Sequence, residues 1–505
     1  MELESKKQIG YGTLLSYAMI IFNTVAGFIY TPWMIKTIGD NNYALYSMVI
    51  SLINFFLMDF GLSTATQRYV AKYAAENKKE QIKDLLGVVF KLYLIIMGVI
   101  TVVLAVVYLL IDKIYANLGA ESLVTFKNLF LIFAVYCVIN FPFTPLNGIL
   151  NGLEQFKITK MCDLISRLLI ILLIVICLFF GGNVYALVLI NAVVGIFFVG
   201  VKLVILFNKL NVKVNIKYRS AEMTKGVLSF SVWVTVYGIA NRFAVTLTPQ
   251  ILGIFSVTKE VTVYTLASQI EGNAYTLITV LGSLFLPEVS RILSKDNSRE
   301  NLQALMTKVG RIQGFIGYLA IVGFAAIGLS FVRCWMGTGY DSVYICALLM
   351  LVPNIVIDTQ TIAGTALDAD NKVMQRALLC IGQAALSLGL SSILAGILGA
   401  YGACIGLFAS YILKLIGLNI FYKKYFGIKI KKFFKDTIIN MLPPIIISLA
   451  AGFVLEYFLK GGWIMLGIKA IIITAVYCAA FWVFSAKKDE KELIKNLKTK
   501  LLRSK

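Results

Sequence analysis

Long apolar segments alternate with polar connections along the whole chain. A helix needs about 20 apolar residues to cross the hydrocarbon core of a bilayer, and about fourteen segments reach that length. Their approximate bounds are 11–34, 42–66, 85–111, 123–147, 158–180, 183–206, 227–253, 261–286, 309–333, 342–366, 376–398, 401–422, 438–459 and 463–485. A helix satisfies its own backbone hydrogen bonds in lipid. The pattern therefore predicts an all-α integral membrane protein.

Positive charge collects in every second connection and at the ends of the chain. Lys and Arg are frequent in 67–84, 202–225, 287–311 and 414–436 and in the tail from Ala486, whereas the intervening connections are short and carry little charge. Alternate connections lie on one side of the membrane, and Lys and Arg are retained on the cytoplasmic side. Both termini are therefore predicted to be cytoplasmic.

Composition narrows the class of function. The chain has 505 residues, a net charge of +21 and 59% hydrophobic residues, and it contains no histidine. The basic connections face anionic headgroups and no soluble domain remains, so nucleic-acid binding is excluded. Without histidine there is no His-based acid–base chemistry or His-containing metal site. No P-loop occurs, and Asp368-Ala369-Asp370 fits a polar turn better than a glycosyltransferase metal site. The sequence therefore predicts no enzyme, no metal and no cofactor.

A weak internal repeat recurs at a spacing of about 216 residues. Thr31-Pro32 matches Thr248-Pro249, and the stretch 43–46 resembles 261–264. Each repeat contains six predicted spans. Because six is an even number, both repeats start on the same side of the membrane, as in transporters that alternate access between two bundles. The predicted architecture is two pseudo-symmetric six-helix lobes followed by two further helices and a basic tail, with bounds 1–208, 209–425, 426–485 and 486–505.

Three stretches resemble a known family. They are TPWMIKTIGDNNYALYSMV (31–49), MDFGLSTATQRYVAKY (58–73) and FPFTPLNGILNGLEQF (141–156). They are similar to Wzx-type oligosaccharide flippases, in the superfamily that includes MATE exporters and lipid II flippases. The resemblance implies that the protein moves an undecaprenyl-diphosphate-linked oligosaccharide from the cytoplasmic to the outer leaflet of the bacterial plasma membrane, for surface polysaccharide biosynthesis. The family often has an acidic residue where this chain has Gln250.

The resemblance leaves alternatives open. A lipid II or other peptidoglycan-precursor flippase would also need cations for a diphosphate. A MATE-type ion-coupled drug exporter would favour acidic cavity residues instead. A membrane glycosyltransferase or polymerase would need a large external loop, and the uncharged connections are too short for one. The expected partners are the lipid-linked oligosaccharide and membrane lipids, together with a glycan polymerase or glycosyltransferases.

A few cations lie outside the basic connections. Arg242 lies deepest, about 22 Å into its helix at 1.5 Å per residue. A charge at that depth is costly against lipid, so it faces either a cavity, where it could hold a diphosphate, or an internal acid such as Glu271. Arg167 lies one turn after Asp163, which allows either an ion pair or a substrate contact. Lys91 can contact substrate or extend its ammonium to the membrane surface.

Several other residues are candidates for coupling or gating. Glu271 and Asp358 fall inside predicted spans and are candidates for coupling transport to H⁺ or Na⁺. Asp59 and Arg68 are predicted to form a structural clamp. Pro32 and Pro249 are predicted to act in structure or gating, because a proline in a membrane helix frees a carbonyl and permits a bend.

Overall fold

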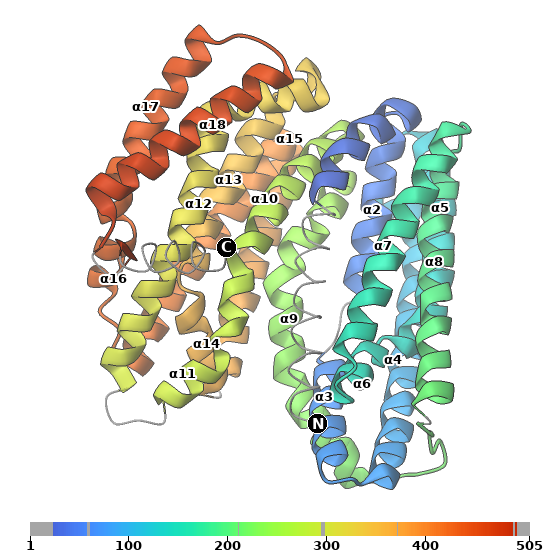
Figure 1. Ribbon diagram of the computed structural model, residues 1–505. Coiled ribbons are helices and arrows are strands. Elements are labelled where there is room, and N and C mark those ends of the chain that lie inside the picture. Colours follow the sequence, from blue (N-terminus) through green and yellow to red (C-terminus); the bar gives the residue numbers. More distant parts are fainter. Residues whose placement is uncertain are drawn as a thin grey trace, which may run out of the picture. The chain divides into compact units, whose positions relative to one another are not determined.

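A computed structural model describes residues 24–57, 61–210, 212–293, 298–370, 372–487 and 490–491. All regular structure in these residues is helical, which confirms the all-α prediction (Figure 1). Eight of the described helices are long and apolar enough to cross a membrane, or nine if the bent pair Ser342–Asp358 and Thr361–Ala369 is one span. The chain is thus a multi-pass membrane protein. The number fourteen and the side of the termini stay predictions.

The chain divides into two compact units. Unit 1 comprises Met1–Thr265 and Val373–Leu407, and unit 2 comprises Leu266–Lys372 and Phe408–Lys505. Two of the three divisions therefore fall within helices, α10 (Thr258–Leu284) and α15 (Val373–Phe426), and the third lies directly before α15. The lobe boundaries predicted at 208 and 425 rest on the sequence repeat, and they stay predictions.

Unit 1 contains a helix over 24–38 and most of the elements from the first half of the chain. The helices α4, α5, α8 and α7 pack in that order side by side, and α2, α3 and α4 each contact α9 (Figure 1). Besides parts of α10 and α15, its other elements are α2 (Asp40–Phe56), α3 (Leu62–Ala75), α4 (Lys79–Ile114), α5 (Ala120–Asn140), η1 (Phe141–Phe143), α6 (Leu146–Gly152), α7 (Phe156–Phe179), α8 (Val184–Val204), η2 (Ile205–Lys209) and α9 (Ala221–Phe255).

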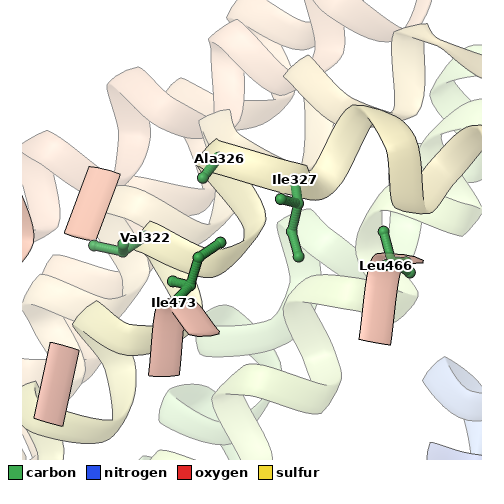
Figure 2. Close-up of a cluster of buried hydrophobic side chains, with 5 residues drawn as sticks. All are labelled: Val322, Ala326, Ile327, Leu466 and Ile473. Atoms are coloured by element: carbon green, nitrogen blue, oxygen red, sulfur yellow. The ribbon is translucent and has the colours of Figure 1, made fainter. Parts of the chain in front are cut away.

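Unit 2 is built around α12, which contacts α11, α13, α14, α16, α17 and α18. Figure 2 shows Val322, Ala326 and Ile327 of α12 with Leu466 and Ile473 of α18 in one buried apolar cluster. Besides parts of α10 and α15, the unit contains α11 (Leu286–Leu293), α12 (Ser298–Met336), η3 (Thr338–Tyr340), α13 (Ser342–Asp358), α14 (Thr361–Ala369), α16 (Ile430–Thr437), η4 (Ile439–Met441), α17 (Leu442–Phe458), α18 (Trp463–Ala480) and η5 (Phe481–Ser485).

A break divides α15 where the sequence predicts a turn between two spans. Gly399 has φ 57° and ψ −134°, a backbone conformation that other residues rarely adopt. Glu260 caps the segment after the break, because its Oε2 accepts a 2.7 Å hydrogen bond from the Ala400 N–H. A Cβ on Gly402 would lie 2.1 Å from the Leu394 carbonyl oxygen. The two halves therefore pack closely against each other, as a helical hairpin requires.

The outer face of α4 is apolar and exposed. Val102 is 64% exposed and Leu109 is 75% exposed, although both belong to the most apolar span of the protein. Apolar surface of this extent is unfavourable in water and favourable against hydrocarbon. The exposed face therefore identifies the surface of unit 1 that contacts lipid.

Candidate functional site

The span formed by α13 and α14 is broken by 55° at Thr359 and Gln360. A broken helix exposes backbone polar groups inside a membrane protein, and such breaks line cavities or ion sites in transporters. Thr361 Oγ1 donates a hydrogen bond to the Asp358 carbonyl oxygen, which caps the end of α13. Gly310 on α12 lets the two backbones approach, since a Cβ there would lie 2.6 Å from the Thr359 carbonyl oxygen.

Polar side chains gather at this break. Gln313, one turn after Gly310, donates from Nε2 to the Ile278 carbonyl oxygen at 3.0 Å and to Thr361 Oγ1 at 3.2 Å. It is fully buried. One amide side chain thereby connects α10, α12 and α14 at the point where the span is interrupted.

The two acids predicted for ion coupling lie in this region. Glu271 of α10 is 1% exposed, and Asp358 at the end of α13 is 6% exposed. Asn354, one helical turn before Asp358, donates from Nδ2 to Glu271 Oε1. Carboxyl and amide oxygens of this kind can bind a hard cation or carry a proton. We call the group Glu271, Asn354, Asp358, Gln313 and Thr361 the polar cluster of unit 2.

Gln250 forms a contrasting network in unit 1. Its Oε1 accepts a 2.7 Å hydrogen bond from the Tyr115 hydroxyl, and its Nε2 donates to the Met48 carbonyl oxygen at 2.7 Å and to Ser51 Oγ at 2.8 Å. The side chain is 7% exposed. A neutral amide with both ends bonded in this way connects α9 to α2 and to the end of α4. Gln250 is therefore a structural brace rather than an ion-coupling group.

Pro249 lies next to Gln250 and leaves one backbone carbonyl of α9 without a partner inside the helix. Proline has no N–H, so the carbonyl four residues earlier, that of Val245, has no partner within the helix. The Tyr264 hydroxyl supplies that partner, donating to the Val245 oxygen at 3.0 Å. The bond joins α10 to α9 at the proline and supports the structural part of the role predicted for Pro249. Pro32 lies half-buried in the helix over 24–38.

The predicted substrate cations occupy different elements. Lys91 on α4 donates a 2.7 Å hydrogen bond to the Tyr218 carbonyl oxygen. Arg167 is exposed on α7, and Asp163 one turn before it pairs with Lys202 of α8 at 2.8 Å. Arg242 belongs to α9, but its side chain lies outside the described part of the structure.

The clamp predicted between Asp59 and Arg68 stays a prediction. Arg68 is exposed on α3, and Asp59 lies outside the described residues. Among the predicted site residues, the structure thus bonds Glu271 to Asn354, one helical turn before Asp358. The predicted substrate cations are spread over α4, α7 and α9.

Several buried cations of the described residues, Lys202, Lys469 and Arg311 among them, are not candidate site residues of the sequence analysis. Lys202 is 9% exposed and bonds Asp163 and Asn147, each at 2.8 Å. Lys469 is 1% exposed and pairs with Glu456 of α17 at 2.8 Å. Arg311 of α12 is 2% exposed. The charge pattern assigned Lys202 and Arg311 to the basic connections. Their burial could have been predicted only from their pairing with distant acids.

Arg311 has the most complete set of partners. Its Nε and Nη2 contact the two carboxylate oxygens of Glu490 at 2.5 and 2.9 Å. Nη1 donates to the Asp436 carbonyl oxygen and Nη2 to that of Ser485, both at 2.6 Å. Burial by itself raises the pKa of Glu490, but hydrogen bonds from Arg311 and the Lys487 N–H, together with both positive charges, hold that pKa below its usual value.

Each unit has a cavity that is lined by cations. The unit 1 cavity has a volume of about 580 Å³ and is lined by Lys91, Arg219 and Lys225 among others. The unit 2 cavity has a volume of about 1390 Å³ and is lined by both Arg311 and Glu490.

The sequence matches the family described as "Polysaccharide biosynthesis protein" over residues 9–293, more than half of the chain. The chain belongs to this polysaccharide biosynthesis family. Among curated proteins none matches significantly.

The fold of this family member is also found in solved transporters. The lipid II flippase MurJ in an inward closed conformation superposes with a TM-score of 0.72 at 14% identity, over 93% of this chain and 98% of that one. An inward-facing MATE multidrug resistance transporter of the MOP superfamily gives 0.69 at 16% identity, over 82% and 98%. A MOP superfamily transporter from Pyrococcus furiosus gives 0.59 at 16% identity, over 84% and 96%.

These matches confirm the resemblance inferred from the sequence. The chain has the fold of flippases and transporters rather than of enzymes, as predicted.

Proposed function

We propose that this polysaccharide biosynthesis protein is a flippase that carries a polyprenyl-diphosphate-linked oligosaccharide from the cytoplasmic to the outer leaflet of a bacterial plasma membrane. The observation that carries the proposal is the family match over 9–293, on a chain with the fold of a lipid flippase. The substrate has a large polar headgroup and a tail that never leaves lipid. A two-bundle transporter that alternates access suits such a substrate, because only the headgroup needs a path through the protein.

Loss of the gene provides the first test. A deletion strain is expected to accumulate the lipid-linked oligosaccharide on the cytoplasmic side and to lack the corresponding surface polysaccharide. Normal surface polysaccharide in the deletion strain would refute the proposal. Purified protein in vesicles should move the lipid-linked oligosaccharide in preference to lipid II.

A lipid II flippase is the second candidate. The superposition on MurJ, which covers 93% of the chain, favours it. The vesicle experiment separates the two candidates, since each substrate can be labelled and offered alone. Faster movement of lipid II than of the lipid-linked oligosaccharide would reverse our assignment. Movement of neither lipid together with export of a cationic drug would favour the MATE-type alternative.

Arg242 is proposed to bind the diphosphate. The sequence predicts that Arg242 lies about 22 Å into a membrane span, at 1.5 Å per residue, and a guanidinium can bond two phosphate oxygens at once. Replacement by Ala is expected to abolish export while the protein still inserts. The matched control is Arg333→Ala, because Arg333 is exposed and paired with Asp341 at 2.6 Å near the end of α12. Normal export by Arg242→Ala would remove this residue from the site.

The polar cluster of unit 2 is proposed to couple transport to H⁺ or Na⁺. Its support is the burial of Glu271 and Asp358, with Asn354 bonded to Glu271. Glu271→Gln keeps the size of the side chain and a carbonyl oxygen for Asn354, but it can no longer be ionised. The variant is expected to fold normally and to transport without dependence on an ion gradient. Unchanged gradient dependence would place the coupling group elsewhere.

A further inference from the structure

The lining of the unit 1 cavity has two chemically different parts. One part is cationic and polar, with Lys91, Arg219, Thr224 and Lys225. The other part is apolar and is made by the next turns of the same two helices. Among the described lining residues none is acidic. The cavity therefore offers positive charge without a carboxylate of its own to neutralise it.

The order of polar and apolar residues is the same on both helices. On α4, Ile95 lies one turn after Lys91, and on α9, Leu228 and Val232 lie one and two turns after Thr224. Residues four apart share a helix face, so each helix presents a polar group followed by apolar ones. Ile95 is 65% exposed, and Leu228 and Val232 are 36% and 47% exposed. The lining thus changes from charged to apolar in the direction that leads into the membrane.

The loop over 212–220 holds the cationic part in place. Asn215 bonds α4 twice, with its N–H to the Lys83 carbonyl oxygen at 3.0 Å and its Nδ2 to Asp84 Oδ1 at 2.7 Å. Gly87 permits this approach, since a Cβ there would lie 1.9 Å from the Asn215 carbonyl oxygen. Lys91 completes the attachment through Tyr218. Arg219 therefore follows a segment that is fixed to α4 rather than a free loop.

We propose that this cavity binds an anionic phospholipid of the leaflet predicted to be cytoplasmic. The phosphate would contact Lys91, Arg219 and Lys225, and the acyl chains would cover Ile95, Leu228 and Val232. An ammonium has three donors, so Lys91 can keep its bond to Tyr218 and still reach a phosphate oxygen. All lining residues belong to unit 1, which suits a permanently bound lipid better than a substrate that must be released on the other side.

The experiment measures lipid binding and needs no transport. The wild-type protein is placed in nanodiscs of phosphatidylcholine with increasing phosphatidylglycerol, and retained lipid is counted by native mass spectrometry. The test variant is Arg219→Gln with Lys225→Gln, which leaves the bond from Lys91 to Tyr218 intact. The matched control is Lys213→Gln with Lys217→Gln, which removes the same charge from exposed residues of the same loop outside the cavity lining.

Phosphatidylglycerol is expected to bind the test variant about thirtyfold more weakly than the wild type, since each of the two cations near a membrane surface contributes about fivefold. The control variant is expected to bind it normally. Equal binding to the wild type and the test variant would overturn the proposal, as would equal retention of phosphatidylcholine. Displacement of phosphatidylglycerol by an equal amount of polyprenyl diphosphate would assign the site to the transported lipid instead. None of these outcomes depends on the proposed flippase activity.

Discussion

The two cavities are both lined by several cations but differ in how the charge is balanced. In the unit 2 cavity the buried Arg311 contacts both carboxylate oxygens of Glu490, and Lys487 pairs with Asp436 at 2.9 Å. In the unit 1 cavity, among the described lining residues, Lys91 bonds a neutral carbonyl and no carboxylate is present. Lysine and arginine therefore have different roles in the two cavities. A cation neutralised by the chain itself stabilises the fold, whereas one held by a carbonyl keeps its charge for a ligand.

The same contrast separates the two buried polar networks. Gln250 in unit 1 has every bond supplied by neutral groups, so it can only brace helices. Glu271 in unit 2 is a carboxyl group bonded by an amide, so its charge can change when a proton or cation binds. Burial alone does not distinguish these residues, since both are largely inaccessible to solvent. The chemistry of the partner decides which network can respond to an ion.

The largest expected effect comes from Arg311→Ala. The change leaves Glu490 without its guanidinium partner and removes the donors to the Asp436 and Ser485 carbonyl oxygens. Breaking a buried ion pair from one side costs about 3 kcal/mol or more of unfolding free energy. In detergent, the variant should unfold at a lower denaturant concentration or temperature than the wild type. Lys308→Ala is the control, because Lys308 lines the same cavity but is exposed. If both variants unfold alike, the Arg311 pair has no special structural role.

The pH dependence of stability gives a smaller effect on the same pair. The folded pKa of Glu490 lies below its usual value of 4.5, so ionised Glu490 stabilises the fold. That contribution is complete above about 4.5 and is lost as the pH falls through the lower folded pKa. The unfolding midpoint should therefore drop between neutral and strongly acidic pH by more in the wild type than in Glu490→Gln. Parallel pH profiles of the two proteins would contradict this assignment.

Much of the fold could be predicted because the membrane imposes local rules. Segment length and hydropathy predicted helices, and the turn between 376–398 and 401–422 is realised at Gly399. Both Glu271 and Asp358 were selected because acids within apolar segments are rare. These signals need only a short window of sequence.

The remaining features depend on pairing between distant residues. Lys202 and Asp163 are 39 positions apart, and Arg311 and Glu490 are 179 apart. A basic residue next to a loop looks the same in sequence whether it is exposed or buried against an acid. Asn354 was missed for a similar reason, since an amide in a span has no signal until its partner Glu271 is known. The unit 1 cavity was missed because it needs α4, α9 and the loop over 212–220 together.

The smallest expected effect tests the unit 1 side of the comparison. Lys91→Met keeps the aliphatic stem on α4 but removes the ammonium and its bond to the Tyr218 carbonyl oxygen. The bonds of Asn215 to Lys83 and Asp84 remain, so the loop should stay attached. We expect a loss of about 1 kcal/mol, with faster hydrogen exchange at the amides of the loop over 212–220 and weaker retention of phosphatidylglycerol. A loss as large as that of Arg311→Ala would mean that Lys91 is structural, and the distinction between the two cavities would fail.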